Sequence, residues 1–352
     1  MSAGPWFVIG LGASTPVGRN AWSSAAAVRA GVSGFIEHPY MLDTQGEPMR
    51  VAAAPWLDIG LAGADRLAAL LWPAIAQALE AIDKARRGAL RIGLSLALPA
   101  PRPGLADDAP ASLLAALRAH QGQAFAAMAA FPHDHAAGHL ALAAAMRELD
   151  SGKLDACVVA GVDSYLAPET LEWLEENDRL HGAGELNNAW GIIPGEGAAA
   201  LLVAGATVPR SPRSRSAARL LGVGTAFETR TVAARAVNTG EGLAWALRDA
   251  LRHLPGGVRV SDVYCDLNGE PHRADEYGFA ALRAGSWVES ASDFTAPADC
   301  WGDVAAASAP LHLMLAAVAG AKAYARGHVA CAWASSDGGE RGATLLATDG
   351  RA

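Results

Sequence analysis

Residues Ala156–Asp163 read ACVVAGVD, and residues Ala330–Asp337 read ACAWASSD. Alanine, cysteine, alanine and aspartate recur at the same positions of the two segments, which are separated by roughly half of the chain. Each segment follows an alanine-rich stretch that ends near a glycine and a basic residue. We interpret the match as an internal duplication in which each copy is a buried strand preceded by a helix.

Around these segments the sequence alternates between short apolar runs and longer alanine-rich stretches. Runs such as WFVIGL and LRIGLSLAL are typical of buried strands, and residues 137–149 are typical of a helix. A Ser/Pro/Arg stretch at residues 208–219 has no apolar periodicity and predicts a linker. We therefore expect an α/β fold with an N-terminal half at residues 1–207 and a C-terminal half at residues 220–352.

Composition narrows the class of protein. Of 352 residues, 51% are hydrophobic and 18% are charged, which suits a large core and is too apolar for disorder. A net charge of −8 argues against a nucleic-acid partner. We expect no membrane span and no secretory signal, because long apolar runs and a basic N-terminal region are missing. The four cysteines have no paired short spacing, which favours a reducing cytoplasm, and no cofactor is expected.

Four motifs, in the same order along the chain, resemble those of the β-ketoacyl synthases. Residues 7–34, FVIGLGASTPVGRNAWSSAAAVRAGVSG, resemble that family's N-terminal strand, its TGxGxxSPxG turn and its AGxSG segment. GIIPGEGAAALLV at residues 191–203 resembles GFVxGEGAGxLVL, and GDVAAASAPLHLM at residues 302–314 resembles GHxxGAAGxxxL. SSDGGERGATLLA at residues 335–347 resembles SFGFGGxNAxLVL. The resemblance covers nearly the whole chain.

This resemblance implies the thiolase-like fold, in which five layers, αβαβα, are built from two pseudo-repeated halves. It also implies a dimer, because the family pairs through a strand beside the nucleophile block, here near AFAAMAAF at residues 124–131. The family condenses acyl thioesters through a cysteine at a helix N-terminus, and two histidines assist decarboxylation of a malonyl thioester. An acyl carrier protein is a further partner that the resemblance implies.

The resemblance does not extend to the catalytic residues. Counted back from the following strand, the nucleophilic cysteine of the family falls on His135, and Gly138 matches the glycine three residues later. The first histidine falls on Asn268, and the second falls on Gly302, one residue before Asp303. The Cys-His-His triad is therefore absent, which predicts that the chain is not a competent condensing enzyme.

Three histidines, His133, His135 and His139, lie within seven residues and leave three interpretations open. With Asp134 or Asp303 they could hold a metal ion, but no HExxH motif is present and we predict no metal site. His135 could instead act as a base or acyl acceptor, because a helix N-terminus lowers the pKa of an imidazole. Otherwise the imidazoles fill the former cysteine pocket and do no chemistry.

The remaining candidates lie near the degenerate positions. The candidate catalytic residues are His135, Asn268 and Glu270, since Glu270 could form an acid–base pair with His135 or with His272. Alternatively, these side chains form a structural network that closes the loop. The candidate substrate-binding residues are His139, His272, Asp303, Gly338 and Gly339, although Asp303 is also a possible cap of the helix that follows it.

Three functions remain open at this point. The leading one is a degenerate ketosynthase-like protein that acts as a partner subunit, as chain-length factors do in fatty-acid or polyketide biosynthesis, or as an adaptor. The second is an acyl-thioester transferase or hydrolase that uses His135 with Glu270. The third is a non-catalytic acyl-binding protein or scaffold. The expected partners are a second copy of the chain or a ketosynthase, and an acyl carrier protein.

Overall fold

The computed structural model describes residues 4–119, 124–183, 187–212, 214, 218–252 and 254–348. The first group of elements is β1 (Trp6–Ser14), α1 (Ala21–Arg29), β2 (Ile36–Leu42), β3 (Pro48–Val51), α2 (Gly63–Leu79), α3 (Lys84–Arg87), β4 (Ile92–Leu98), α4 (Ala109–Ala119), β5 (Ala127–Pro132), η1 (Asp134–Ala136), α5 (Ala137–Asp150), β6 (Ala156–Ser164), α6 (Pro168–Glu176) and β7 (Glu196–Gly205). The second group is β8 (Ala218–Phe227), η2 (Val232–Ala234), α7 (Glu241–Leu251), β9 (Asp262–Cys265), α8 (Pro271–Ala284), α9 (Ala298–Trp301), η3 (Ala305–Ala307), α10 (Ser308–Ala321), β10 (Val329–Ser335) and β11 (Glu340–Ala347).

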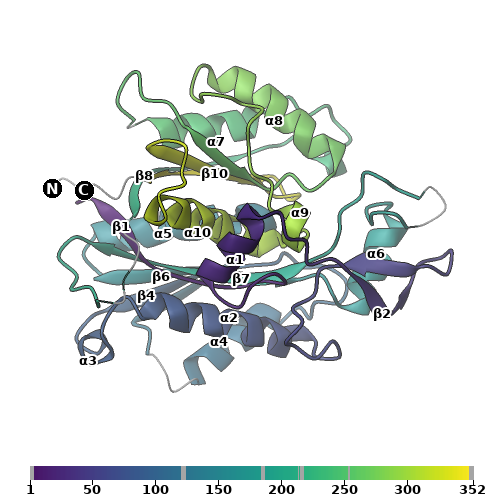
Figure 1. Cartoon of the computed structure of the whole chain (residues 1–352), viewed down its shortest axis with the longest axis horizontal. Helices are drawn as coiled ribbons and strands as arrows, with labels where there is room; N and C mark the ends of the chain where they lie inside the picture. The colour runs from purple at the N-terminus through teal and green to yellow at the C-terminus, as the bar shows by residue number, and fades with distance from the viewer. Residues whose placement is uncertain are drawn as a thin grey trace.

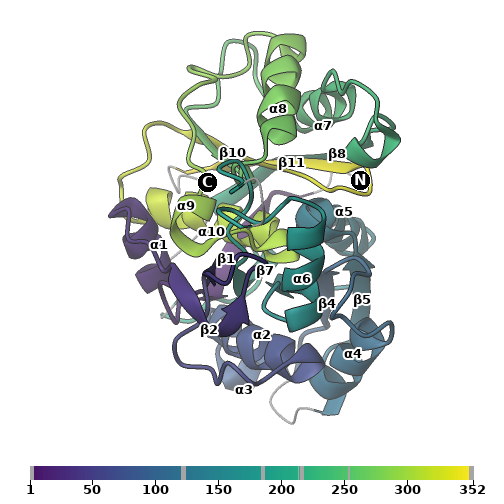
Figure 2. The ribbon, with the colours of Figure 1, turned by 90° about the vertical axis from the view of Figure 1, so that its right-hand side faces the viewer.

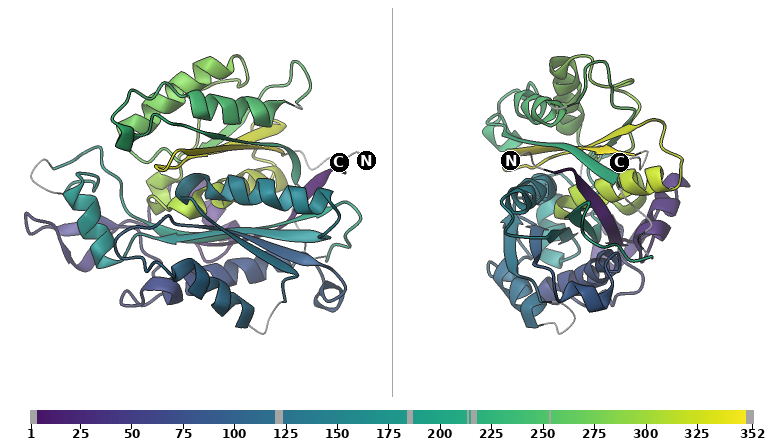
Figure 3. Two further views of the ribbon diagram at one scale, coloured as in Figure 1. Left: turned by 180° about the vertical axis from the view of Figure 1, so that it is seen from behind. Right: turned by 90° about the vertical axis from the view of Figure 1, so that its left-hand side faces the viewer.

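These elements form five layers, as expected for the thiolase-like fold (Figure 1). Helices α2 and α4 cover the outer face of the β5-β4-β6-β7-β1 strands, and α7 and α8 cover the outer face of β8-β11-β10-β9. Helices α5 and α10 lie between the two sets of strands, which is also clear from behind (Figure 3). A short pairing of β1 with β8 joins both sets into one nine-stranded sheet.

The two sets of strands have the same connectivity, which confirms the internal duplication. Strand β6 pairs in parallel with β4 and antiparallel with β7, just as β10 pairs in parallel with β9 and antiparallel with β11. Cys157 lies on β6 and Cys331 lies on β10, and both side chains are fully buried. Each of these strands follows a central helix, α5 or α10.

Close packing of strand on helix also repeats. A Cβ atom added to Gly12 of β1 would lie 1.9 Å from the Ala74 carbonyl oxygen of α2. A Cβ atom added to Gly224 of β8 would lie 2.0 Å from the Ala246 carbonyl oxygen of α7. Only glycine allows the backbones to approach so closely, so these positions fix the distance between each outer helix and its sheet.

The connection between the two groups of elements runs from the end of β7 at Gly205 to the start of β8 at Ala218. Part of the predicted linker, residues 213 and 215–217, lies outside the described residues, and β8 includes residues 218 and 219. The predicted boundaries at residues 207 and 220 therefore stay predictions. In the described part of the chain, every helix is too short or too polar to cross a membrane.

Candidate functional site

The site is built where η1 and α5 begin, directly after β5. Asp134 has a φ of 52°, in the left-handed region that a residue other than glycine occupies only at a cost. Its Oδ1 atom accepts a hydrogen bond of 2.7 Å from the backbone N–H of Ala100, which helps to hold this turn. The turn directs the next residue, His135, into the interior, where its side chain is only 2% exposed.

Inside the molecule, His135 meets residues from two distant segments. Its Nε2 atom lies 2.8 Å from Oδ1 of Asp303, which follows α9. The Nδ2 atom of Asn268, in the loop after β9, donates to Oδ2 of the same carboxylate at 2.6 Å. The backbone N–H of Ala305 also donates to Asp303 at 2.8 Å. Asp303 thus caps the η3 turn before α10 and also joins His135 to Asn268.

The charge on His135 differs from the sequence-based expectation. Burial and the nearby Arg273 lower the pKa of His135, but the Asp303 carboxylate, its hydrogen bond and Asp266 outweigh them. The pKa of the imidazole is therefore raised, whereas a helix N-terminus alone was expected to lower it. Burial raises the pKa of Asp303, but His135, its hydrogen bond and Arg273 hold that pKa far below its usual range. Both directions favour a proton on the imidazole and a charge on the carboxylate.

Glu270 is held by two arginines rather than by His135. Arg179 donates from Nε and Nη2 to the Glu270 carboxylate at 2.7 and 3.0 Å, and Arg273 Nε donates at 3.3 Å. Asn268 Nδ2 lies 3.1 Å from the same carboxylate. Burial raises the pKa of Glu270, but Arg273 and Arg179 outweigh it and lower the pKa overall. These contacts fit the structural network, while His272 Nε2 lies 3.9 Å from the same carboxylate, and the acid–base role expected of Glu270 stays a prediction.

Arg273 of α8 completes the cluster, although the sequence analysis did not single it out. Its side chain is 1% exposed and donates to Asp266 at 2.9 Å, to Asp337 at 3.1 Å and to the Ser335 carbonyl at 2.6 Å. Its Nη2 atom also lies 3.5 Å from the His135 ring. A signal was available in the sequence, because Arg273 follows Glu270 by three residues and so shares a helix turn with it.

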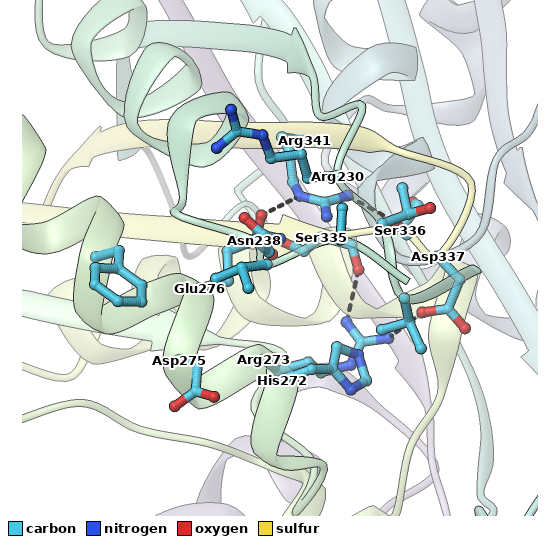
Figure 4. A pocket seen from close by; sticks show the side chains of 15 residues that line it. Arg230, Asn238, His272, Arg273, Asp275, Glu276, Ser335, Ser336, Asp337 and Arg341 are labelled. Atoms are coloured by element: carbon cyan, nitrogen blue, oxygen red, sulfur yellow. Dashed lines mark hydrogen bonds and ion pairs between the residues drawn. The ribbon is translucent and has the colours of Figure 1, made fainter. Parts of the chain in front are cut away.

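Two cavities adjoin the cluster. One, of about 440 Å³, is lined by Asp134, Tyr165, Trp173, Arg179, Glu270, His272 and Asp337, among others. The second, of about 280 Å³, lies beside it and shares Val232, His272 and Asp337 with the first. Figure 4 shows this second cavity, where Arg273 reaches from α8 toward Ser335 and Arg341 pairs with Glu276. The cavity of about 440 Å³ is called the upper cavity from here on.

Comparisons with known proteins identify the architecture. Residues 108–207 match the family model for the N-terminal domain of β-ketoacyl synthases. One solved structure is a type II polyketide synthase complex of an acyl-carrier protein with its ketosynthase bound to a hexaketide. It is 14% identical over 98% of this chain and 99% of that chain, with a TM-score of 0.77. The chain has the thiolase-like fold of the ketosynthases.

Two further solved structures show the same ketosynthase fold. The ishigamide ketosynthase/chain length factor is 22% identical over 98% of this chain and 99% of that chain, with a TM-score of 0.64. The ketosynthase from module 6 of the bacillaene synthase from Bacillus subtilis 168 is 14% identical over 97% of this chain and 72% of that chain, with a TM-score of 0.73. No curated protein matches the sequence.

The three positions that align with the ketosynthase triad, His135, Asn268 and Gly302, lie close together in the structure. His135 and Asn268 both bond to Asp303, the neighbour of Gly302. Gly302 has a φ of 75°, and a Cβ atom there would lie 2.6 Å from the Ile193 carbonyl oxygen. The backbone conformation and the nearby carbonyl thus require glycine at position 302. The side chain that contacts His135 and Asn268 comes from Asp303, the next residue.

The two other histidines of the group at residues 133–139, His139 and His133, have separate partners. His139 Nδ1 lies 2.8 Å from the Thr344 hydroxyl, and burial lowers the pKa of this histidine to about 3. His133 pairs at 2.9 Å with Glu340 at the surface. Among the described residues, no group of three or more His, Cys, Asp or Glu side chains is placed to hold a metal ion.

The remaining expected substrate-binding residues divide between the cavities and a turn. His272 lines both cavities, and the pKa of its imidazole is lowered by burial and by Arg273. Gly338 and Gly339 lie in the turn between β10 and β11, where the Gly339 carbonyl accepts from the backbone N–H of Glu228 at 2.7 Å. Ser336 and Asp337, just before them, line the cavity of Figure 4.

The cysteines of the chain lie in its interior. All four cysteines are free and buried, at positions 157, 265, 300 and 331. Burial raises the pKa of Cys157 to about 11 and raises the pKa of the other three thiols as well. A thiol with a raised pKa carries little thiolate at neutral pH and is a poor nucleophile.

Proposed function

We propose that the chain is a non-condensing, ketosynthase-like subunit that pairs with an active ketosynthase, as a chain-length factor does. The observation that carries this proposal is the closed cluster in which His135 and Asn268, at two of the triad positions, both bond to Asp303, the neighbour of the third position, Gly302. The similarity to the ishigamide ketosynthase/chain length factor supports the same role.

The chemistry of condensation explains why this cluster is unsuited to it. The reaction needs a nucleophile that holds the acyl group and donors that stabilise an enolate. The Asp303 carboxylate 2.8 Å from Nε2 raises the pKa of His135, which favours the protonated ring, and a protonated imidazole has no lone pair for attack. An anionic Asp303 beside the reacting carbon would repel a developing enolate rather than stabilise it.

The proposed pairing uses the open edge of the sheet. Strand β5 pairs with β4 on one side and is the last strand of the sheet on the other. Its residues Ala127 and Ala129 are exposed, and it carries no charged side chain to prevent edge pairing. We propose that β5 pairs with the same strand of a ketosynthase subunit, which would extend the sheet across the dimer.

An acyl carrier protein is a proposed partner of the assembled pair rather than of this chain alone. The carrier would deliver acyl groups to the cysteine of the ketosynthase subunit, while the present chain would shape the space at the interface. The predicted cytoplasmic location is consistent with this role. A homodimer and an adaptor role outside lipid synthesis remain the competing outcomes of the test.

The test has two parts. The purified chain is incubated with malonyl and acyl thioesters of a carrier protein, and decarboxylation, condensation and any covalent acyl adduct are followed by mass spectrometry. The chain is also co-expressed with a cysteine-containing ketosynthase, and the pair is purified through a tag on one subunit.

We expect no turnover and no adduct from the chain alone, and a stoichiometric complex from co-expression. Turnover by the chain alone that disappears in a His135→Ala variant would overturn the proposal in favour of an unconventional enzyme. A stable homodimer that does not exchange with the ketosynthase would overturn the pairing.

A further inference from the structure

A separate cavity of about 280 Å³ lies beside the β2–β3 hairpin, away from the cavity of Figure 4. It is enclosed by β2, the N-terminal turn of α2, the loop after β4 and the segment that leads into α6; Figure 2 shows these helices and β2 on the face toward the viewer. Its walls are mainly apolar, with Met41, Ile59, Leu61, Leu67, Leu105 and Leu166 among them. We call it the hairpin cavity.

Some polar side chains in the wall of this cavity have hydrogen-bond partners within the protein, and others do not. Arg66 donates from Nε and Nη2 to Glu196 at 2.5 and 2.7 Å, and Ser164 also donates to Glu196. Thr170 donates to the Pro103 carbonyl at 2.6 Å. These groups are therefore satisfied within the protein. The described residues that line the cavity include two arginines and a histidine but no carboxylate.

Two N–H donors in the wall are left for a ligand. Arg102 uses its terminal nitrogens on Asp163 and on the Ser164 carbonyl, but its Nε–H is buried without a partner in the described part of the chain. The Arg102 side chain lines the cavity and is 6% exposed, so this N–H lacks both a protein partner and the hydration of a surface group.

His38 supplies the second donor. Its Nδ1 atom accepts from the backbone N–H groups of Tyr40 and Met41 at 3.3 and 3.0 Å. An imidazole nitrogen that accepts carries no proton, so the ring proton of neutral His38 is on Nε2. Burial and the nearby Arg66 lower the pKa of His38, which keeps the ring neutral. Among the described residues no hydrogen bond uses this Nε2–H, and the ring that carries it lines the cavity.

We propose that the hairpin cavity binds a small apolar monocarboxylate, whose tail packs against the leucine-rich wall and whose carboxylate accepts from Arg102 Nε–H and His38 Nε2–H. A carboxylate fits because both of these N–H groups are donors, and a charged donor such as a guanidinium forms the stronger hydrogen bonds. An ammonium group would find no carboxylate to pair with among the described lining residues. Arg102 also lines the upper cavity, but there Asp134, Glu270 and Asp337 add carboxylates to the wall. This inference does not depend on the proposed function.

The test compares two ligands of equal length and opposite charge. Binding of octanoate and of octylamine to the full chain is measured by titration calorimetry at neutral pH. We expect octanoate to bind and octylamine not to bind. A His38→Asn variant keeps an acceptor for the Tyr40 and Met41 backbone but removes the Nε2 donor, so octanoate should bind roughly tenfold more weakly.

A pair of filling variants locates the ligand. Leu61→Trp fills the hairpin cavity and should abolish octanoate binding, whereas Val232→Trp fills the upper cavity and should leave the affinity unchanged. Circular dichroism and thermal melting establish that each variant is folded. Absence of octanoate binding in the millimolar range, equal binding of octylamine, or loss of binding in Val232→Trp but not in Leu61→Trp would each overturn the proposal.

Discussion

Asp303 accepts hydrogen bonds from three directions: the His135 ring, the Asn268 amide and the Ala305 backbone. Its carboxylate is nearly inaccessible to water, so these partners replace the hydration that it would have in solution. Because His135 is equally buried, neither charge is tolerable without the other. The residue that was expected to bind substrate or cap a helix therefore holds the cluster together.

Replacing Asp303 by alanine should destabilise the fold by about 3–5 kcal/mol, because it leaves the His135 charge and the Asn268 amide buried without their partner. Urea denaturation measures the change. The control is His133→Ala, which removes a pair with Glu340 in which the histidine is 41% exposed, and should cost no more than about 1 kcal/mol. Equal losses in both variants would contradict the account of the cluster.

Two buried histidines should make the protein sensitive to acid. Burial lowers the pKa of His139 to about 3, and burial with the neighbouring His139 and His135 lowers the pKa of His312 to about 3. A histidine in the unfolded chain binds its proton below its ordinary pKa of 6.5, while the folded one does not. Stability is therefore lost as the pH falls from about 6.5 toward 3, by about 2 kcal/mol per histidine at pH 5.

The measurement is urea denaturation at pH 7 and at pH 5 for the parent and for His312→Leu. The stability difference between the two pH values should shrink by about 2 kcal/mol in the variant. The raised pKa of His135 acts in the opposite direction, since its stabilisation is present at low pH and fades as the pH rises. Because it acts in both proteins, the comparison isolates His312. An unchanged pH difference would contradict a neutral His312.

At the scale of elements, the repeated contact between an outer helix and a glycine-containing strand is the feature that the sequence analysis missed. Gly10 and Gly12 of β1 lie against Ala78 and Ala74 of α2. Glycine at alternate positions of this strand was a signal of such a contact in the sequence. Gly222 and Gly224 of β8 approach α7 in the same way. A glycine in a strand and an alanine in a helix are each common. Only the fold shows that they meet.

Gly12→Ala and Gly224→Ala should therefore destabilise the protein by similar amounts, about 1–3 kcal/mol or more, because each methyl group would collide with a helix backbone. Chemical denaturation of both variants tests the equivalence. Gly88→Ala is the control, since no atom lies within 4 Å of the added Cβ, and it should change stability by less than about 0.5 kcal/mol. A strong effect at only one of the two positions would argue against the repeat.

At the scale of the whole molecule, the cluster joins segments from both groups of elements. His135 comes from the start of α5, and Asp303 precedes α10. Arg179 follows α6 and reaches both Glu270 and Asp337 in the later part of the chain. Charged contacts thus span the region where the two sets of layers meet. In the proposed function they hold the subunit closed while the partner carries out the chemistry.

Assembly through β5 gives a prediction at the same scale. Ala129→Lys places an ammonium group on the exposed edge strand and should weaken pairing with the ketosynthase by roughly tenfold or more, about 1.4 kcal/mol, without unfolding the subunit. Size-exclusion chromatography with light scattering measures the complex. Ala85→Lys, on the exposed helix α3, is the control and should leave the complex intact. A complex that tolerates Ala129→Lys would move the interface elsewhere.

The sequence by itself indicated the alternation of strands and helices and the duplication, and the family resemblance implied the five layers. Strands and helices alternate with the periods of their apolar residues, and those periods follow from local backbone geometry. The repeat of Ala156–Asp163 in Ala330–Asp337 identified two equivalent strands, and the family motifs placed His135 and Asn268 at degenerate positions. Each of these inferences depends on neighbours along the chain.

Only the tertiary structure decided the chemistry of the site. The partner of His135 is Asp303, 168 residues away, and Glu270 binds Arg179 and Arg273 instead of the imidazole. A pKa depends on burial and on charges a few ångströms away in space, which local sequence does not encode. The helix N-terminus alone predicted a lowered pKa for His135, but the carboxylate that folding brings beside it raises that pKa.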